Sequence, residues 1–253
     1  MDRWVAKTAI VTGASSGIGE AIAEELVKAG MQVVGLARRV ELVQANSEKL
    51  TQNNYKGKLY AVKCDIRSEA EICKAFEWTT KNVGIVHVLV NNAGIILPTN
   101  LINGDAEMWR TILETNIFGL CVAQKEACKL MMAHNIAGHI VNINSDAGHG
   151  HYYFPTNSVY GASKHALTNI CEMMRLELLA HKSNIKITSV SPSETRTGLT
   201  APEFISEEVF EMLKDMPIME SKNVADAILY SLSTPPDVLI TEISLRAIGN
   251  KFC

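Results

Sequence analysis

Short apolar runs alternate with longer amphipathic segments along almost the whole chain. Runs this apolar are typical of strands buried on both faces, and they are expected at Thr8–Val11, Gln32–Ala37, Lys58–Lys63, Val86–Val90, His139–Ile143, Ile185–Val190 and Val238–Leu245. The amphipathic segments have helical spacing, and the expected helices are Ile18–Ala29, Glu41–Gln52, Ser68 to about Lys81, Asp105–His134, Asn157–Lys182 and Asn223–Ser231. This alternation predicts one α/β domain over residues 1–253, with a parallel sheet covered by helices on both faces.

Length, charge and cysteine content narrow the class of protein. The chain has 253 residues, 47% of them apolar, which is enough for one large domain with a full core. A net charge of -3 argues against a nucleic-acid-binding surface. We see no apolar run long enough for a membrane span and no secretory leader, so we expect a cytoplasmic protein. The 6 cysteines contain no Cys-x-x-Cys pair and no histidine cluster has metal spacing, so we expect buried, reduced cysteines and no metal site.

A glycine-rich turn follows the first expected strand and reads Thr12-Gly13-Ala14-Ser15-Ser16-Gly17-Ile18-Gly19. Three glycines between a strand and a helix allow the backbone to approach a pyrophosphate, and the helix start offers free N–H groups. The spacing is Gly-x-x-x-Gly-x-Gly rather than Gly-x-Gly-x-x-Gly, so an ordinary tight turn is the alternative. The position between strand and helix favours a dinucleotide site.

The second expected strand ends at Ala37-Arg38-Arg39. A site for NAD has a carboxylate at this point to bind the ribose 2′-hydroxyl. Alanine stands in its place, and guanidinium groups match the charge of a 2′-phosphate. The alternative is a solvated helix start, but the missing acid favours NADP(H) as the cofactor.

Tyr160 and Lys164 are four residues apart near the start of a long expected helix. Side chains with this spacing lie one above the other, which brings the ammonium near the phenol. A free tyrosine has a pKa of about 10, and a nearby positive charge lowers it toward neutrality. Such a pair alone is typical of a solvated helix face. As part of a site it predicts a group that donates and accepts a proton.

Further polar residues gather where neighbouring strands end. Ser145 follows the fifth expected strand, and the carboxyl edge of an open α/β sheet is where ligands bind. The turn Asn91-Asn92-Ala93-Gly94 follows the fourth strand at the same edge. Asn116 lies inside a long expected helix, where helix propensity gives an amide little reason to be.

In the order of these motifs the chain resembles the short-chain dehydrogenase/reductase family from Thr8 to about Leu245. The resemblance implies a Rossmann-like, doubly wound parallel sheet of seven strands in the order 3-2-1-4-5-6-7. It implies that Tyr160 is the acid/base and that Ser145 orients the carbonyl. Lys164 would hold the nicotinamide ribose and lower the Tyr160 pKa, and Asn116 would anchor a water in the proton relay.

The resemblance also implies a cofactor site and an oligomer. Asp65 would meet the adenine and Asn92 would lie along the adenosine ribose. The family's long fourth and fifth helices build dimers or tetramers, so we expect a homo-oligomer, most simply a homodimer. The expected cofactor-binding residues are Gly13, Ser15, Ser16, Gly17, Ile18, Gly19, Arg38, Arg39, Asp65, Ile66, Asn92, Ala93, Gly94, Tyr160, Lys164, Thr195 and Thr197.

Two features depart from the family's pattern. Ser193 stands where the family has the glycine that passes close to the nicotinamide, which puts the local backbone geometry in question. The connection from Ser145 to Tyr160 is about two residues longer than in many members and carries His149, His151, Tyr152, Tyr153 and Phe154. It is either a surface loop or a wall of the substrate pocket.

The segment at about 193–220 bears on the substrate. From Leu199 to Glu220 it has no strand pattern and is rich in apolar side chains, including Phe204, Ile205, Phe210, Met212, Leu213, Met216, Ile218 and Met219. It is either a mobile lid over an apolar pocket or a small amphipathic helix packed for stability. Ile95, Ile96 and Leu97 would form the opposite wall. We therefore expect a small hydrophobic alcohol, aldehyde or ketone as substrate.

The start Met1-Asp2-Arg3-Trp4 and the run Asn-Ile-Asn-Ser-x-x-Gly-His resemble one branch of the family. That branch contains insect farnesol-dehydrogenase-like enzymes and relatives that act on ketosteroids. The resemblance suggests hydride transfer between NADP(H) and an isoprenoid or steroid alcohol. The alternative is a non-catalytic module that binds NADPH or a hydrophobic ligand on the same fold.

Overall fold

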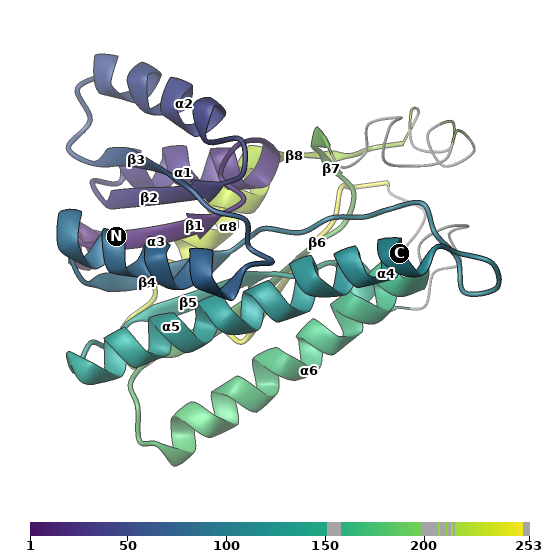
Figure 1. Cartoon of the computed structure of the whole chain (residues 1–253). Helices are drawn as coiled ribbons and strands as arrows, with labels where there is room; N and C mark the ends of the chain where they lie inside the picture. Colours follow the sequence, from purple (N-terminus) through teal and green to yellow (C-terminus); the bar gives the residue numbers. More distant parts are fainter. Residues whose placement is uncertain (151–157, 199–206, 208–210, 212–213, 215, 250–253) are drawn as a thin grey trace.

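The computed structural model describes residues 1–150, 158–198, 207, 211, 214 and 216–249. Seven parallel strands form one sheet in the order β3-β2-β1-β4-β5-β6-β9, which confirms the expected order 3-2-1-4-5-6-7 (Figure 1). The strands are β1 Thr8–Thr12, β2 Gln32–Ala37, β3 Lys58–Lys63, β4 Val86–Asn91, β5 His139–Ile143, β6 Lys186–Pro192 and β9 Glu242–Leu245.

Helices cover both faces of this sheet (Figure 1). One face carries α1 Gly17–Lys28, α2 Val40–Gln52 and α8 Ser221–Ser233, and the other carries α3 Glu69–Asn82, α5 Gly119–Ala133 and α6 Ser158–Ala180. The helix α4 Ala106–Leu113 precedes α5. In the described part of the chain, no helix combines the length and apolarity needed to cross a membrane.

The central strands are largely apolar because alternate residues enter two different cores. In β1, Ala9 and Val11 belong to the core under α1 and α8, whereas Ile10 between them belongs to the core under α3 and α5. In β5, Val141 and Ile140 divide in the same way. Successive side chains of a strand point to opposite faces, so each strand stabilises both layers. Each fully buried side chain of this size contributes about 1.5–3 kcal/mol.

Three elements differ from those the sequence predicts. The helix expected over Asp105–His134 contains a π-helical turn, η2 Glu114–Phe118, between α4 and α5. The last strand begins at Glu242 rather than Val238, and the Val238 carbonyl accepts a hydrogen bond from the Lys186 ammonium instead of joining the ladder. The segment from Leu199 to Glu220 is expected to contain no strand, but it ends in a two-residue strand, β8 (Met219–Glu220). This strand pairs with β7 (Thr195–Arg196).

Candidate active site

The glycine turn lies at the carboxyl end of β1 and packs directly against the turn after β4. Gly13 and Gly17 have φ of +68° and +60°, in the left-handed region that favours glycine. A Cβ on Gly19 would lie 2.3 Å from the Gly13 carbonyl oxygen and 2.4 Å from Asn92 Nδ2. The turn is therefore shaped by backbone, with the α1 N-terminus behind it, and this cradle suits a dinucleotide diphosphate.

The turn after β4 holds the glycine turn in place. Asn92 Nδ2 donates to the carbonyls of Thr12 (3.0 Å) and Gly13 (3.2 Å). The backbone N–H groups of Asn92 and Ala93 both donate to Thr12 Oγ1 at 3.0 Å. The Asn92 amide is thus engaged with the turn itself, a contact that sequence reasoning missed when it placed this residue along the ribose.

The two arginines after β2 are exposed beside the glycine turn. Arg39 Nη2 donates to Ser16 Oγ at 3.1 Å, with Ser15 Oγ at 3.5 Å. Ala37, the last residue of β2, is buried and carries no carboxylate beside the two arginines. Ser15, Ser16 and Arg39 therefore form one polar, cationic edge of the cradle.

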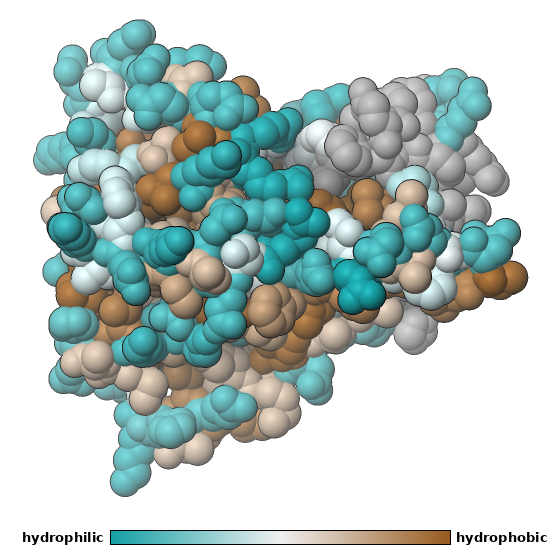
Figure 2. Space-filling view, viewed as in Figure 1, coloured by the Kyte–Doolittle hydropathy of each residue, from teal (hydrophilic) through white to brown (hydrophobic). Residues whose placement is uncertain are grey.

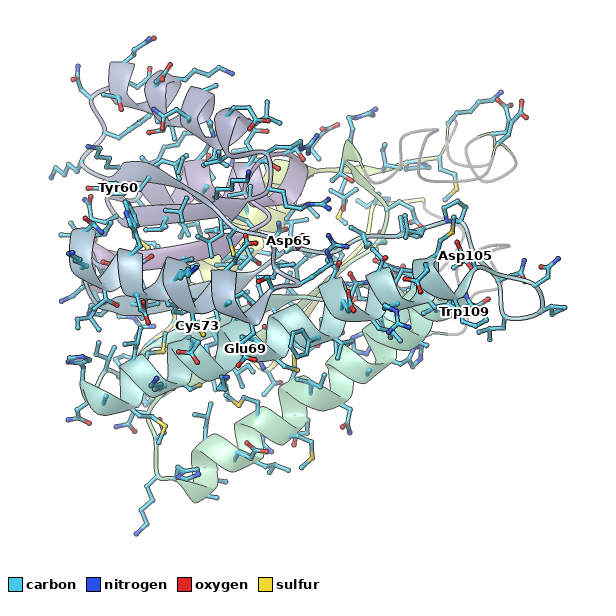
Figure 3. All side chains as sticks on the ribbon, in the orientation of Figure 1. Tyr60, Asp65, Glu69, Cys73, Asp105 and Trp109 are labelled. Carbon is cyan, nitrogen blue, oxygen red and sulfur yellow. The ribbon has the colours of Figure 1, made fainter. Side chains whose placement is uncertain are left out.

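Asp65 follows β3, and Figure 3 labels it at the same edge of the sheet. Arg67 forms a bidentate ion pair with the Asp65 carboxylate, in which Nη2 donates to Oδ2 at 2.7 Å and Nε donates to Oδ1 at 3.1 Å. These hydrogen bonds hold the pKa of Asp65 below its usual range. Nothing in the sequence marks Arg67 as the partner of Asp65.

Ile66 lies between Asp65 and Arg67 and packs against Gly119. A Cβ on Gly119 would lie 2.2 Å from the Ile66 carbonyl oxygen.

Asn116 lies in the π-helical turn η2 and is buried. Its Oδ1 accepts from the Ile95 N–H at 2.9 Å, and its Nδ2 donates to the Ile95 carbonyl (3.0 Å) and to Ser163 Oγ (3.1 Å). Single π-turns within α-helices are often found at functional sites. The amide joins the segment after β4 to α6, which explains its place inside a helix.

Lys164 of α6 is 6% exposed, and its Nζ donates to the Ile143 carbonyl at the end of β5 (2.9 Å). The same Nζ lies 5.6 Å from the Tyr160 ring centroid and 4.0 Å from the position that a Cβ on Gly94 would take. Burial lowers the pKa of Lys164 to about 8. The spacing of four residues thus brings the two side chains together as predicted.

Ser145 follows β5 and is buried at the start of the short 3-10 helix η3 (Asp146–Gly148). Its Oγ donates to Asp146 Oδ1 (3.1 Å), accepts from the Ala147 N–H (3.2 Å) and also shares a hydrogen bond with the Tyr160 phenol. Burial raises the pKa of Tyr160 to about 12. The Tyr160 pKa thus lies above the free-tyrosine value because desolvation of the phenol is the largest effect. That Lys164 lowers this pKa stays a prediction.

The departure at Ser193 is accommodated without strain. Among described residues the non-glycine positions with positive φ are Ala6, Asn54, Asn135 and Lys182, and Ser193 is not one of them. Its N–H donates to the Leu245 carbonyl at 2.8 Å, and its own carbonyl accepts from Thr195 Oγ1 at 2.9 Å. Thr197 instead packs over Gly17, with Cγ2 3.1 Å from the position a Cβ would take.

The sequence matches the short chain dehydrogenase family over residues 7–208. The chain belongs to this family. It is 47% identical over 253 residues to farnesol dehydrogenase of Aedes aegypti, a match that covers 100% of both chains. It is 36% identical to dehydrogenase/reductase SDR family member 11 of Gallus gallus, over 97% of this chain and 98% of that protein.

A solved structure of a variant of actinorhodin polyketide ketoreductase with NADPH superposes with a TM-score of 0.83. It is 28% identical, and the match covers 95% of this chain and 96% of that one. This likeness agrees with the fold described above.

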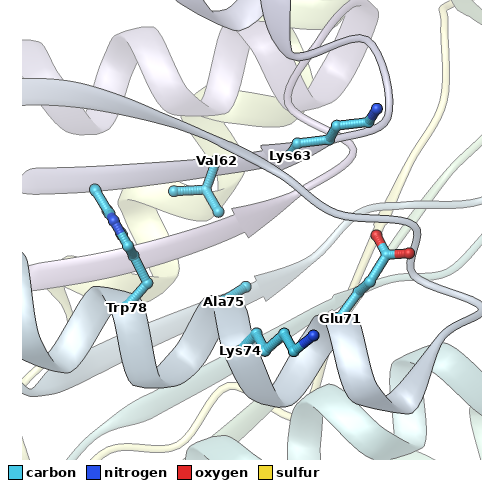
Figure 4. A pocket seen from close by; sticks show the side chains of 6 residues that line it. All are labelled: Val62, Lys63, Glu71, Lys74, Ala75 and Trp78. Atoms are coloured by element: carbon cyan, nitrogen blue, oxygen red, sulfur yellow. The ribbon is translucent and has the colours of Figure 1, made fainter.

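One hollow on the described surface lies apart from this site, between β3 and α3 (Figure 4). Its lining consists of Val62, Lys63, Glu71, Lys74, Ala75 and Trp78. Figure 4 shows the Trp78 and Val62 side chains on one side and the charged Lys74 and Glu71 on the other. None of the predicted site residues lines it. Within the described ranges no group of three His, Cys, Asp or Glu side chains is placed to hold a metal ion.

Several predicted substrate residues lie outside the described residues. They are His151, Tyr152, Tyr153 and Phe154 of the connection before α6, and Leu199, Phe204, Ile205, Phe210, Met212 and Leu213 of the segment expected to cover the pocket. His149 is described, and its Nε2 lies 3.0 Å from Ser191 Oγ and 3.4 Å from Glu242 Oε1. The connection is therefore tied to β6 and β9 where it leaves η3.

Proposed function

We propose that the protein transfers a hydride between NADP(H) and a hydrophobic alcohol, aldehyde or ketone. The observation that carries the proposal is the cluster of Ser145, Tyr160 and Lys164 at the carboxyl edge of the sheet. The glycine cradle lies at the end of β1 in the same sheet, so one extended cofactor can reach from cradle to cluster. Bound NADP(H) would supply or accept the hydride, and the protein would supply orientation and a proton.

In this proposal Tyr160 moves the proton at its phenol oxygen. With a raised pKa the phenol is protonated at neutral pH, so it is ready to act as an acid toward a carbonyl oxygen. Ser145 orients the substrate oxygen beside it. Lys164 holds the ribose of the cofactor, and Asn116 fixes the segment after β4 to α6 and anchors the proton relay.

We propose NADP(H) rather than NAD as the cofactor. Support comes from the exposed Arg38 and Arg39, from the alanine at position 37 and from the NADPH in the similar ketoreductase structure. The expected contacts of Asp65, Ile66, Gly94, Thr195 and Thr197 with the cofactor stay part of the same proposal.

For the substrate we propose an isoprenoid alcohol such as farnesol, with steroid alcohols as the next class. The support is the 47% identity to a farnesol dehydrogenase along the whole chain. The segment at about 193–220 would cover this substrate, and its described ends are joined by the β7–β8 pair. We place all of these parts in one domain, residues 1–253.

The test measures turnover of a substrate panel with NADP and with NAD in parallel. The absorbance of reduced nicotinamide monitors the reaction. Terpenoid and steroid alcohols and the matching carbonyls form the panel, and Tyr160→Phe serves as the inactive control. Turnover with NADP and a long-chain alcohol supports the proposal. Silence with every substrate and both cofactors, together with measurable NADPH binding, supports the non-catalytic module instead.

We also propose a cytoplasmic homo-oligomer built on α5 and α6. Apolar residues gather over this region in Figure 2, and the exposed ones include Phe118, Met173, Leu176 and Leu179. Exposed apolar side chains that gather on one part of a surface are typical of a site where another protein binds. The described cysteines are free, as expected in a reducing compartment. Sedimentation of wild type against Met173→Lys tests the interface, and a wild-type monomer would contradict it.

A further inference from the structure

Asp146 is a buried acid directly beside the proposed reaction centre. It begins η3, immediately after Ser145, and it is 7% exposed. Burial of a carboxylate is costly unless hydrogen bonds compensate for lost water. The Ser145 hydroxyl supplies one such bond, with Oγ 3.1 Å from Asp146 Oδ1.

This bond decides where the Ser145 proton points. A serine hydroxyl has one proton and two lone pairs. The proton goes to Asp146, and the Ala147 N–H occupies one lone pair. The Tyr160 phenol is the second group that can take this proton, and a hydrogen bond from Ser145 lowers the Tyr160 pKa because it stabilises the phenolate. While Asp146 holds the Ser145 proton, the phenolate lacks that hydrogen bond and the protonated phenol is favoured.

The charge of Asp146 acts in the same direction. Both Asp146 and Glu194, from the segment between β6 and β7, raise the pKa of Tyr160 by their negative charge. Lys164, one turn further along α6, places its ammonium 5.6 Å from the ring centroid and opposes them. Asp146 acts on the phenol in a second way as well, through the Ser145 hydroxyl that both groups contact.

We propose that Asp146 is a positioning residue: it fixes the direction of the Ser145 hydroxyl and places a negative charge that keeps Tyr160 in its acid form. Its effect on catalysis rests on the proposed oxidoreductase function. Carbonyl reduction needs the phenol as an acid, whereas alcohol oxidation needs it as a base. Asp146 therefore favours carbonyl reduction at neutral pH.

The simpler alternative is that Asp146 only supports the short helix η3. A control residue separates the two roles, because Asp105 is also a carboxylate at the start of a helix: it is the N-cap of α4, with Oδ1 accepting from the Glu107 N–H at 2.9 Å. Asp105 is an exposed residue that forms no part of the proposed site. Loss of a capping carboxylate there should leave Tyr160 unchanged.

The experiment titrates Tyr160 directly and through catalysis. The ultraviolet absorption of tyrosinate is measured against pH for wild type and for Asp146→Asn. From each curve, the curve of the same protein carrying Tyr160→Phe is subtracted, which leaves the titration of Tyr160. We expect Asp146→Asn to move the Tyr160 midpoint down by about one pH unit, that is, about tenfold more phenolate at a given pH. The acid limb of the alcohol-oxidation pH profile should move by the same amount, and Asp146→Glu should restore both.

The outcomes separate the two proposals. An unmoved midpoint in folded Asp146→Asn overturns the inference, as does an equal shift in Asp105→Asn. If Asp146→Asn does not fold, Asp146→Ser is titrated in its place: a midpoint equal to that of wild type overturns the inference, and a lower one supports it. If the midpoint moves but no substrate is turned over by wild type, the proposed function fails while the electrostatic role of Asp146 stands.

Discussion

The cradle after β1 and the cluster after β5 lie on one sheet edge but are held in different ways. Gly13, Gly17 and Gly19 shape the cradle through backbone conformation and close approach, and the arginines beside it are exposed. The cluster is instead held by buried side chains that form specific hydrogen bonds. Lys164 donates to the Ile143 carbonyl, and Ser145 donates to Asp146. The cradle should therefore be sensitive to added atoms, and the cluster to lost polar groups and altered charge.

The largest effect expected is from Tyr160→Phe, which removes one oxygen from the cluster. We expect kcat to fall by about 10²–10⁴-fold, because the proton step loses its acid, while NADPH binding changes little. Steady-state kinetics and a fluorescence titration with NADPH measure the two quantities. Tyr60→Phe is the control, since it removes a phenol oxygen bonded to Gln32 on the edge of the sheet. Substantial turnover by Tyr160→Phe would contradict the assigned role.

Gly19→Ala adds one carbon to the cradle and tests the opposite sensitivity. The new Cβ would meet the Gly13 carbonyl oxygen at 2.3 Å, so the turn must move. Overpacking of this kind costs about 1–3 kcal/mol, and we expect NADPH to bind about tenfold more weakly or worse. Gly161→Ala is the control, because a Cβ there meets nothing within 4 Å. Equal NADPH affinity in the two variants would show that the cradle is not the diphosphate site.

The double variant Ala37→Asp with Arg38→Ala tests the charge at the edge of the cradle. A charged hydrogen bond contributes about 1.5–3 kcal/mol, so the preference for NADP over NAD should fall by about 10–100-fold. The ratio of kcat/KM for the two cofactors measures it. Lys49→Ala removes an exposed cation from α2 and should leave the ratio unchanged. An unaltered preference in the double variant would mean that the 2′-phosphate is recognised elsewhere.

The last prediction concerns stability rather than catalysis, and near neutral pH its effect is the smallest. His139, at the start of β5, is 1% exposed and has Nε2 2.8 Å from Thr188 Oγ1. Burial lowers its pKa from 6.5 to about 3, so below pH 6.5 the unfolded chain binds a proton that the folded chain does not. The free energy of unfolding should thus fall by up to about 1.4 kcal/mol per pH unit as the pH drops from 6.5 toward 3.

His139→Asn removes this titration and should flatten the acid side of the stability curve, measured by urea unfolding at several pH values. His134→Asn, at the exposed end of α5, is the control. A slope in His139→Asn equal to that of wild type would show that His139 is not the group responsible.

The alternation of strands with helices and the meeting of Tyr160 with Lys164 could be predicted because they follow from period and spacing, whereas the strand order was implied by the resemblance to the family. The π-turn around Asn116 could not, since one extra residue in a helical turn leaves the apolar pattern of Asp105–His134 almost unchanged. The Tyr160 pKa could not either, because the spacing of residues says which groups are neighbours but not how far water is excluded. Nothing in the sequence marks Asp146, because only the fold buries it beside Ser145.

The short β7–β8 pair has a consequence for how such proteins diversify. Arg196 and Glu220 are joined by an ion pair of 2.9 Å, and Ser221 Oγ donates to the Arg196 carbonyl at 3.1 Å. These contacts bring the two ends of the stretch between Arg196 and Glu220 together beside the main sheet. The strands of the main sheet and the glycine cradle lie outside this stretch, apart from the contact of Thr197 with Gly17. We therefore expect a stretch exchanged after Thr197, even one of different length, to leave the strand register and the cradle as they are. This part of the chain can thus diversify separately from the rest of the domain.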